Sequence, residues 1–311
     1  MSRLWQAREF PLMLMILAGS LAMSLLSEVF LTPENLLATL LGLSFEAIVA
    51  AGMTLLLVSG GFDLSVGSTV AMSGAVAALA LKAGLPVPVS ILMGLLAGAT
   101  VGLANGLLIA LTRVNAFIVT LGMMGIVRGI LMVATEGRNI SGLPPAFNAI
   151  GQSKLLGVQF PIWAALAVVL VGDLLLRKFR FFRQSYYIGG NERAALLSGI
   201  AVKRVKVVNY ALTGLLAGLA GVLMTARLGA ATVTAATGLE LKVISAAIIG
   251  GASLQGGEGT VLGAFLGAVL MALITGALTL LGVSIYWNTL VMGSTLLLAV
   301  MIDTWSRRRV G

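Results

Sequence analysis

A glycine stands at every fourth position of Gly94-Leu95-Leu96-Ala97-Gly98-Ala99-Thr100-Val101-Gly102-Leu103-Ala104-Asn105-Gly106, which lies inside an apolar stretch over residues 87–112. Residues four apart share one face of an α-helix, so these glycines form a face almost without side chains. Such a face allows the backbone of a neighbouring helix to approach closely in lipid. The pattern predicts a membrane helix in a tightly packed bundle. Shorter versions of it occur at Gly259, Gly263 and Gly267 and at Gly214 and Gly218.

The composition of the whole chain is also that of a membrane protein. Of its 311 residues, 59% are hydrophobic and 10% are charged, whereas soluble domains are about 25% charged. Apolar stretches of about 17–25 residues recur along it, each able to cross a ~30 Å hydrocarbon layer as a helix. We expect an all-α integral membrane protein with one polytopic domain over residues 1–311. The predicted crossings are 11–28, 36–59, 66–82, 87–112, 116–135, 160–177, 207–227, 239–252, 259–281 and 285–303.

Several classes of function are excluded or disfavoured by what the sequence lacks. It contains no cysteine and no histidine, which removes disulfides, thiol chemistry and the commonest metal ligand. No paired acids occur at a recognisable spacing, so we expect no catalytic residues, no metal site and no intramembrane enzyme. The net charge of +9 comes mainly from basic residues at the ends of apolar spans, which indicates membrane topology and not nucleic-acid binding.

The distribution of basic residues predicts the orientation in the membrane. Short cytoplasmic loops carry an excess of Lys and Arg, and an arrangement with the N-terminus inside best satisfies this rule. Both termini and the segment 177–206, which holds eight of the 20 basic residues, are then cytoplasmic. The first span is expected to remain as a membrane anchor. The external side receives Lys82, Arg138, Lys154, Arg227 and Lys242, together with the loop 136–159, as a partner surface or an ordinary connector.

Two glycine-rich turns separate predicted spans. They begin at Gly60-Gly61-Phe62-Asp63-Leu64-Ser65-Val66-Gly67-Ser68 and at Gly250-Gly251-Ala252-Ser253-Leu254-Gln255-Gly256-Gly257-Glu258-Gly259, and they suggest a weak internal repeat. Helices broken at membrane depth are tolerated only where protein or a wet cavity satisfies the backbone, and transport sites are often built there. Neither turn contains the Lys-Ser/Thr pair of a phosphate loop.

Charged residues within the predicted spans require partners. Glu46 lies in the second span and Arg128 in the fifth, and an ionised group at the bilayer centre costs about 2.5–3.5 kcal/mol on insertion scales. The two side chains are candidates to pair with each other or to form local hydrogen bonds, or one of them lines a permeation path. Asp63, at the first glycine turn, is expected to cap the start of the third span, where free amide groups meet its carboxylate.

Besides the two glycine turns, five further stretches are distinctive. They are Ala51-Gly52-Met53-Thr54-Leu55, Ala116-Phe117-Ile118-Val119-Thr120-Leu121-Gly122 with Arg128-Gly129, Thr237-Gly238-Leu239-Glu240, Leu281-Gly282-Val283 and the polar segment described next. Taken together, from residue 45 to about 303, these stretches resemble in kind and in order those of the permease subunits of bacterial sugar ABC importers, especially the ribose-type branch. Two positions depart from the family pattern: Phe182-Arg183 stands where a Gly-Arg pair is common, and the first turn reads Gly-Phe-Asp where Gly-Ile-Asp is commoner.

The resemblance implies that residues 189–200 form a cytoplasmic coupling helix inserted into an ATP-hydrolysing subunit. Asn191 is a good N-cap and Gly199 a good terminator, while Ala194, Ala195 and Leu196 offer a compact apolar knob. The flanking basic residues hold the segment at the anionic inner leaflet. The expected coupling residues are Gly189, Gly190, Asn191, Glu192, Ala194, Ala195, Ser198, Gly199 and Ile200. An ordinary basic loop is the alternative.

The resemblance also implies the partners and the location. They are an ABC ATPase that binds ATP and Mg, a periplasmic or extracellular sugar-binding protein, and a second permease copy or paralogue. We therefore expect no cofactor in this chain and a place in the bacterial inner (cytoplasmic) membrane. ATP binding would close the ATPase subunits and shift the glycine-faced helices, so that a central cavity alternates its opening. The expected path or intramembrane polar network comprises Glu46, Asp63, Asn105, Thr120, Arg128 and Asn288.

Two other transport functions stay open at this point. A secondary transporter driven by protons or sodium would use Glu46, Asp63 and Arg128 as a relay. An ABC permease for an amino acid or a nucleoside would share the same architecture, because specificity lies largely with the binding protein. The sequence leaves undecided which molecule is carried and whether the dimer is homo- or heteromeric.

Overall fold

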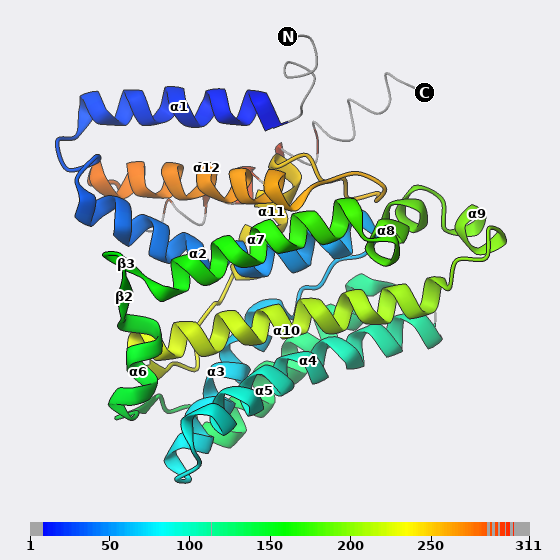
Figure 1. Ribbon diagram of the computed structural model, residues 1–311, viewed down its shortest axis with the longest axis horizontal. Coiled ribbons are helices and arrows are strands. Elements are labelled where there is room, and N and C mark those ends of the chain that lie inside the picture. The colour runs from blue at the N-terminus through cyan, green and yellow to red at the C-terminus, as the bar shows by residue number, and fades with distance from the viewer. Residues whose placement is uncertain are drawn as a thin grey trace.

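The computed structural model describes residues 9–112 and 114–284 and the positions 287, 290, 291, 293–295, 297, 298 and 301. The described part is a helical bundle with short strands only in its connections (Figure 1). The helices are α1 (Glu9–Leu26), α2 (Pro33–Val58), α3 (Val66–Lys82), α4 (Val87–Thr112), α5 (Ala116–Thr135), α6 (Pro145–Gln152), α7 (Phe160–Lys178), α8 (Arg180–Gly190), α9 (Glu192–Leu197), α10 (Val202–Leu228), α11 (Leu239–Ile249) and α12 (Val261–Leu280). The strands are β1 (Ile140–Ser141), β2 (Lys154–Leu155), β3 (Val158–Gln159) and β4 (Ala230–Ala231).

The prediction of an all-α membrane protein is confirmed. Within the described residues, seven helices are long and apolar enough to cross a membrane, namely α1, α2, α4, α5, α7, α10 and α12. The predicted spans 66–82, 87–112 and 116–135 coincide with α3, α4 and α5. The predicted tenth span, 285–303, lies largely outside the described residues, so the expected number of ten crossings stays a prediction.

The eighth predicted span, 239–252, is not one continuous helix. Helix α11 has 11 residues and ends at Ile249, so it extends about 16 Å, roughly half of a ~30 Å hydrocarbon layer. The preceding segment 229–238 is non-helical, and its strand β4 pairs with β1. Ala236 and Gly238, just before α11, adopt positive φ values of 55° and 80°. The predicted eighth crossing therefore coincides with an irregular segment followed by a half-length helix.

The glycine face of α4 packs closely on a neighbouring helix, as predicted, and that helix is α10. A Cβ atom at Gly98 would collide with the carbonyl of Gly214, and one at Gly102 with the carbonyl of Tyr210. Gly106 faces Val207 in the same contact. In α12, Gly263 and Gly267 lie against the backbone of α11 in the same manner. The small-residue pattern therefore marks two backbone-to-backbone helix contacts.

Helix α2 is the centre of the bundle. Ser44, Phe45 and every residue from Ala47 to Val58 are buried, because α7, α10, α11 and α12 surround the helix. A helix that is apolar on all sides belongs in such a position. It contacts α10 closely at Gly52, whose carbonyl accepts a 3.0 Å hydrogen bond from Thr213 Oγ1.

Connections that the topology assigns to the same side of the membrane gather at the same end of the bundle. At one end, Gly189 of α8 lies against Gly256, Gly257 and the carbonyl of Val58, and Gly257 N donates to that carbonyl at 2.9 Å. At the other end, Lys82 Nζ donates to the carbonyl of Gly142 at 3.0 Å. Figure 1 shows α8 and α9 at the first end, and α6, β2 and β3 at the second.

We predict that Gly102→Ala lowers the thermal unfolding temperature of the purified protein in detergent, whereas Gly125→Ala leaves it near the wild-type value. The added methyl at Gly102 meets the α10 backbone, while nothing lies within 4 Å of a Cβ at Gly125 in α5. Overpacking of this kind costs about 1–3 kcal/mol. Equal unfolding temperatures for the two variants would contradict the proposed role of the α4–α10 contact.

Candidate functional site

A polar groove of about 520 Å³ lies between α2, α11 and α12. Seven of its fourteen lining residues carry hydroxyl, amide or charged side chains. Its polar lining consists of Asn35, Thr39 and Glu46 on α2, Thr237 and Lys242 at α11, and Thr275 and Thr279 on α12. Polar side chains set among apolar ones suit a molecule that carries several hydroxyl groups, because the polar groups can bond and orient it.

The spacing of the lining residues explains how the groove forms. Asn35, Thr39, Gly42 and Glu46 recur at intervals of three or four, so they share one face of α2. On α12 the side chains of Thr275 and Thr279 are one turn apart, and Gly276 leaves room beside them. Two polar faces thus oppose each other, and α11 closes the groove on one side.

Glu46 pairs with Lys242 across this groove. Glu46 Oε1 and Lys242 Nζ are 3.1 Å apart, and their side chains retain 22% and 40% of their exposure. The predicted pair of Glu46 with Arg128 does not form, because Arg128 belongs to α5, which packs on α3 and α4. The sequence assigned Lys242 to the external side, near the start of the predicted span 239–252, and the residue lies within α11.

Arg128 instead satisfies the backbone of the broken eighth crossing. Its guanidinium donates to the carbonyl of Val233 at 2.6 Å and to that of Ala235 at 3.3 Å. Asn139 Oδ1 accepts from the amide of Val233 at 3.2 Å. Non-helical backbone inside a membrane protein requires such partners. The charge of Arg128 therefore serves to bind the backbone before α11, a partner that the sequence of α5 does not indicate.

Asp63 and Asn105, two of the expected network residues, are brought together in a buried cluster. Asp63 Oδ1 accepts from the amide and the hydroxyl of Ser65 at 2.7 and 2.6 Å. Asn105 Nδ2 of α4 donates to Asp63 Oδ2 at 3.0 Å and to Ser65 Oγ at 2.9 Å. The carboxylate thus bonds an amide at the start of α3, as the capping hypothesis predicts, but the amide is that of the N-cap residue Ser65. Its second oxygen fixes the turn to α4.

Thr120, another of the expected path residues, does not line the groove. Thr120 is buried in α5, and its hydroxyl donates to the carbonyl of Ala116 in the same helix at 2.8 Å. Asn288 lies outside the described residues. Sequence reasoning missed the groove residues other than Glu46, although the helical spacing of Asn35, Thr39 and Glu46 was a signal that could have identified one wall.

The segment expected to couple to a partner folds as two short helices, α8 and α9. Asn191 Oδ1 accepts from the amide of Ala194 at 2.9 Å, which confirms it as the N-cap of α9. Gly199 has a φ of 80°, and its amide bonds Leu196 O while that of Ile200 bonds Ala195 O. This pair of hydrogen bonds is a Schellman motif, so Gly199 ends the helix as predicted. Ser198 Oγ donates to the carbonyl of Ala194, and Glu192 pairs with Lys206 at 2.7 Å.

The apolar knob of this segment differs from the expected one. Ala195 is buried and packs with Ile188, Val202 and Val205, which fastens α9 to α8 and α10. Leu196 and Leu197 are 62% and 85% exposed. The exposed apolar residues of α9 are therefore Ala194, Leu196 and Leu197, so Leu197 takes the place of Ala195 in the expected knob.

Tyr186 ties α8 to the start of α12. Its hydroxyl donates to the carbonyl of Gly259 at 2.8 Å. Burial raises the pKa of the Tyr186 phenol above its usual range, so the hydroxyl keeps the proton that this bond requires.

Comparison with known proteins adds a family to this geometry. The family model described as "Branched-chain amino acid transport system / permease component" matches residues 35–300. The ribose import permease protein RbsC of Escherichia coli (strain K12) is 42% identical, with 90% of this chain and 88% of the relative covered. The L-arabinose ABC transporter permease protein AraH of Azospirillum brasilense is 40% identical, with 90% and 83% covered. The autoinducer 2 import system permease protein LsrC of Salmonella choleraesuis is 33% identical, with 95% and 85% covered. No solved structure matches the chain significantly.

Replacing Arg128 by Gln should destabilise the fold more than replacing Arg138 by Gln. Loss of the guanidinium leaves the partly buried carbonyls of Val233 and Ala235 without this donor, and an unsatisfied buried polar group costs about 1–3 kcal/mol. Arg138 is exposed in the loop 136–159 and serves as the matched control. Thermal unfolding in detergent measures both, and a wild-type unfolding temperature for Arg128→Gln would overturn this role.

Proposed function

Because the chain belongs to the family of branched-chain amino acid transport system permease components, we propose that it is the permease subunit of an ATP-driven ABC importer whose cargo is a monosaccharide or a related small polyol. The sugar cargo is inferred from the sequence identity of 40–42%, over 90% of the chain, to permeases named for ribose and L-arabinose. The family description alone would favour an amino acid, so an amino-acid cargo is the alternative to test.

The polar groove between α2 and α12 supports a path for a polyol. Its amide and hydroxyl groups, from Asn35, Thr39, Thr275 and Thr279, can exchange hydrogen bonds with sugar hydroxyls. The Glu46–Lys242 pair leaves little net charge in the groove, which suits a neutral cargo. We propose that a second permease copy or paralogue faces this groove and completes the path.

The contacts of α8 support a route by which ATP hydrolysis in a separate subunit moves the groove. The exposed leucines of α9 would insert into that subunit. Gly189, at the end of α8, lies against Val58 at the end of α2 and against Gly256 and Gly257 before α12. Since α2 and α12 are the two long walls of the groove, a displacement of α8 and α9 would reach both walls. ATP and Mg would be held by the ATPase subunit.

The remaining features of the proposal concern location and delivery. The end of the bundle that carries α8 and α9 would face the cytoplasm, with both termini on that side, in the inner membrane of a bacterium. A sugar-binding protein would deliver the cargo at the opposite end, where α6 and the paired strands lie (Figure 1). A relay for protons or sodium is not favoured, because Glu46, Asp63 and Arg128 lie apart and each bonds a different partner.

Proteoliposomes that carry the permease with its ATPase and binding protein test the function. We expect ATP-dependent uptake of radiolabelled ribose or arabinose that persists when ionophores collapse the ion gradients. Leucine uptake in the same vesicles is the matched control and should be absent. Uptake driven by a gradient without ATP would replace the proposal by a secondary transporter, and preferential leucine uptake would replace the sugar by an amino acid.

We expect Leu197→Asp to abolish co-purification of the ATPase subunit and ATP-dependent uptake, because a charge would enter the apolar contact of α9. Leu156→Asp is a close control, since Leu156 is 86% exposed and Leu197 85% exposed, and Leu156 lies at the opposite end of the bundle. An affinity pull-down from membranes measures the association. A coupling role for α9 would be rejected if both variants retained the ATPase equally.

A further inference from the structure

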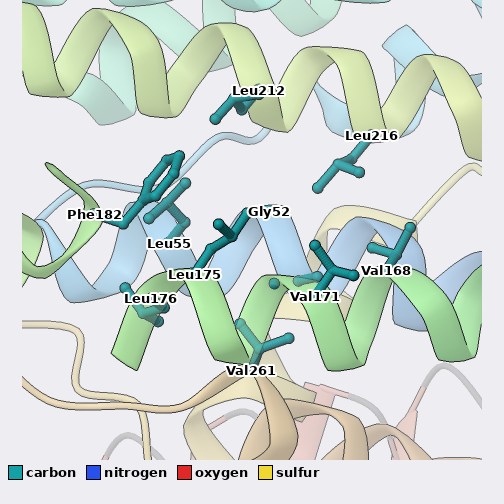
Figure 2. A pocket seen from close by; sticks show the side chains of 12 residues that line it. Gly52, Leu55, Val168, Val171, Leu175, Leu176, Phe182, Leu212, Leu216 and Val261 are labelled. Carbon is teal, nitrogen blue, oxygen red and sulfur yellow. The ribbon is translucent and has the colours of Figure 1, made fainter. Parts of the chain in front are cut away.

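An apolar crevice of about 170 Å³ lies between α7 and α10, with α2 as its floor. All twelve residues that line it are apolar, and Figure 2 shows Leu212 and Leu216 of α10 facing Val168 and Val171 of α7 across it. The crevice is smaller than the roughly 300–1,000 Å³ of most small-molecule sites. Its size and chemistry suit part of a single hydrocarbon chain.

The crevice is open to the surroundings of the bundle. Gly52 in its floor and Gly172 in its wall contribute no side chains, and the nearest neighbour of a Cβ at Gly172 would be Val261, at 3.6 Å. Val171 is 52% exposed, and Leu212 and Leu216 are only partly buried. Because α7 and α10 are membrane-spanning helices by length and composition, the medium at this opening is lipid.

A polar cavity adjoins the crevice at the α8 end. In the chain, Leu176 and Phe182 of the crevice are followed by Arg177 and Arg183, and Val261 is preceded by Thr260. These three neighbours line the polar cavity together with Tyr186 and Tyr187. Arg177 is held by Asp173 at 2.7 Å and by Glu9 at 3.3 Å. Arg183 is exposed and makes no ion pair with a described residue, so its charge is available.

The sequence around this cavity has the composition of a membrane–water interface. Arg177-Lys178-Phe179-Arg180-Phe181-Phe182-Arg183 contains four basic and three aromatic residues and no acid. Aromatic rings concentrate at the headgroup level, and basic residues beside them attract anionic lipids. Phe182 belongs to this basic–aromatic segment, and its ring also closes one end of the apolar crevice (Figure 2).

We propose that this crevice and cavity together bind an anionic phospholipid of the α8-side leaflet, with one acyl chain between α7 and α10 and the headgroup phosphate on Arg183. Charge complementarity selects an anionic headgroup over a zwitterionic one, and the adjoining apolar crevice selects a lipid over a free phosphate. The bound lipid contacts α2 at Gly52 and Leu55 and α12 at Val261. These are the two helices that form the long walls of the polar groove.

Native mass spectrometry of the full chain, purified in detergent with equal amounts of dioleoyl phosphatidylglycerol and dioleoyl phosphatidylcholine, tests the site. We expect selective retention of phosphatidylglycerol by the wild type. Arg183→Gln should lower the preference about five-fold, as expected for one lost basic contact at a membrane surface. Arg204→Gln, which removes an exposed charge of α10 outside both the basic–aromatic segment and the cavity, should leave the preference unchanged.

A second pair of variants tests the acyl-chain crevice. Leu216→Trp fills it and should reduce retention of both lipids, while Leu170→Trp, at a residue of α7 that is 62% exposed and lies outside the crevice, should not. Equal retention of the two lipids by the wild type, or an unchanged preference in Arg183→Gln, would overturn the proposal. So would a change in oligomeric state with Leu216→Trp at unchanged lipid retention, because a second protein chain would then occupy the crevice.

Discussion

The bundle depends on the direct backbone contact between α4 and α10. In lipid, helices gain nothing from burying apolar side chains against each other, so dispersion between closely approaching backbones must hold them together. Gly98 and Gly102 meet Gly214 with no side chain between the two helices. Helix α10 then carries α2 on another face through Gly52 and Thr213. The position of the buried central helix, and with it the polar groove, follows from these contacts.

The same lack of water explains the charges inside the bundle. A break in a membrane helix exposes backbone groups that only protein can satisfy. Arg128 supplies donors to the carbonyls before α11, and Asp63 and Asn105 hold the turn before α3. Helices α3 and α11 thus each begin beside a polar side chain from another helix, Asn105 of α4 and Arg128 of α5. These charges serve the architecture, while Glu46 and Lys242 face the groove.

The polar groove and the proposed coupling segment are linked through contacts between glycines. Gly189 touches the end of α2 and the loop before α12 because none of Gly189, Gly256 and Gly257 carries a side chain. A rigid contact of this kind transmits displacement with little loss, since packed interfaces do not deform continuously. The proposed lipid site adjoins the same place through Phe182 and Val261. Cytoplasmic partner, membrane lipid and transport path would therefore meet at the α8 end of α2.

The sequence by itself determined the class of fold, the helix limits of three spans, the close packing of the glycine faces and the cap and terminator of α9. These features are local, because apolar length, fourfold glycine spacing and capping depend on residues near in sequence. Tertiary structure alone decided the partners of Glu46 and Arg128, the burial of Ala195 and the second wall of the groove. Each of these depends on which helices become neighbours, and periodicity shows that a helix has a packing face without showing which helix will cover it.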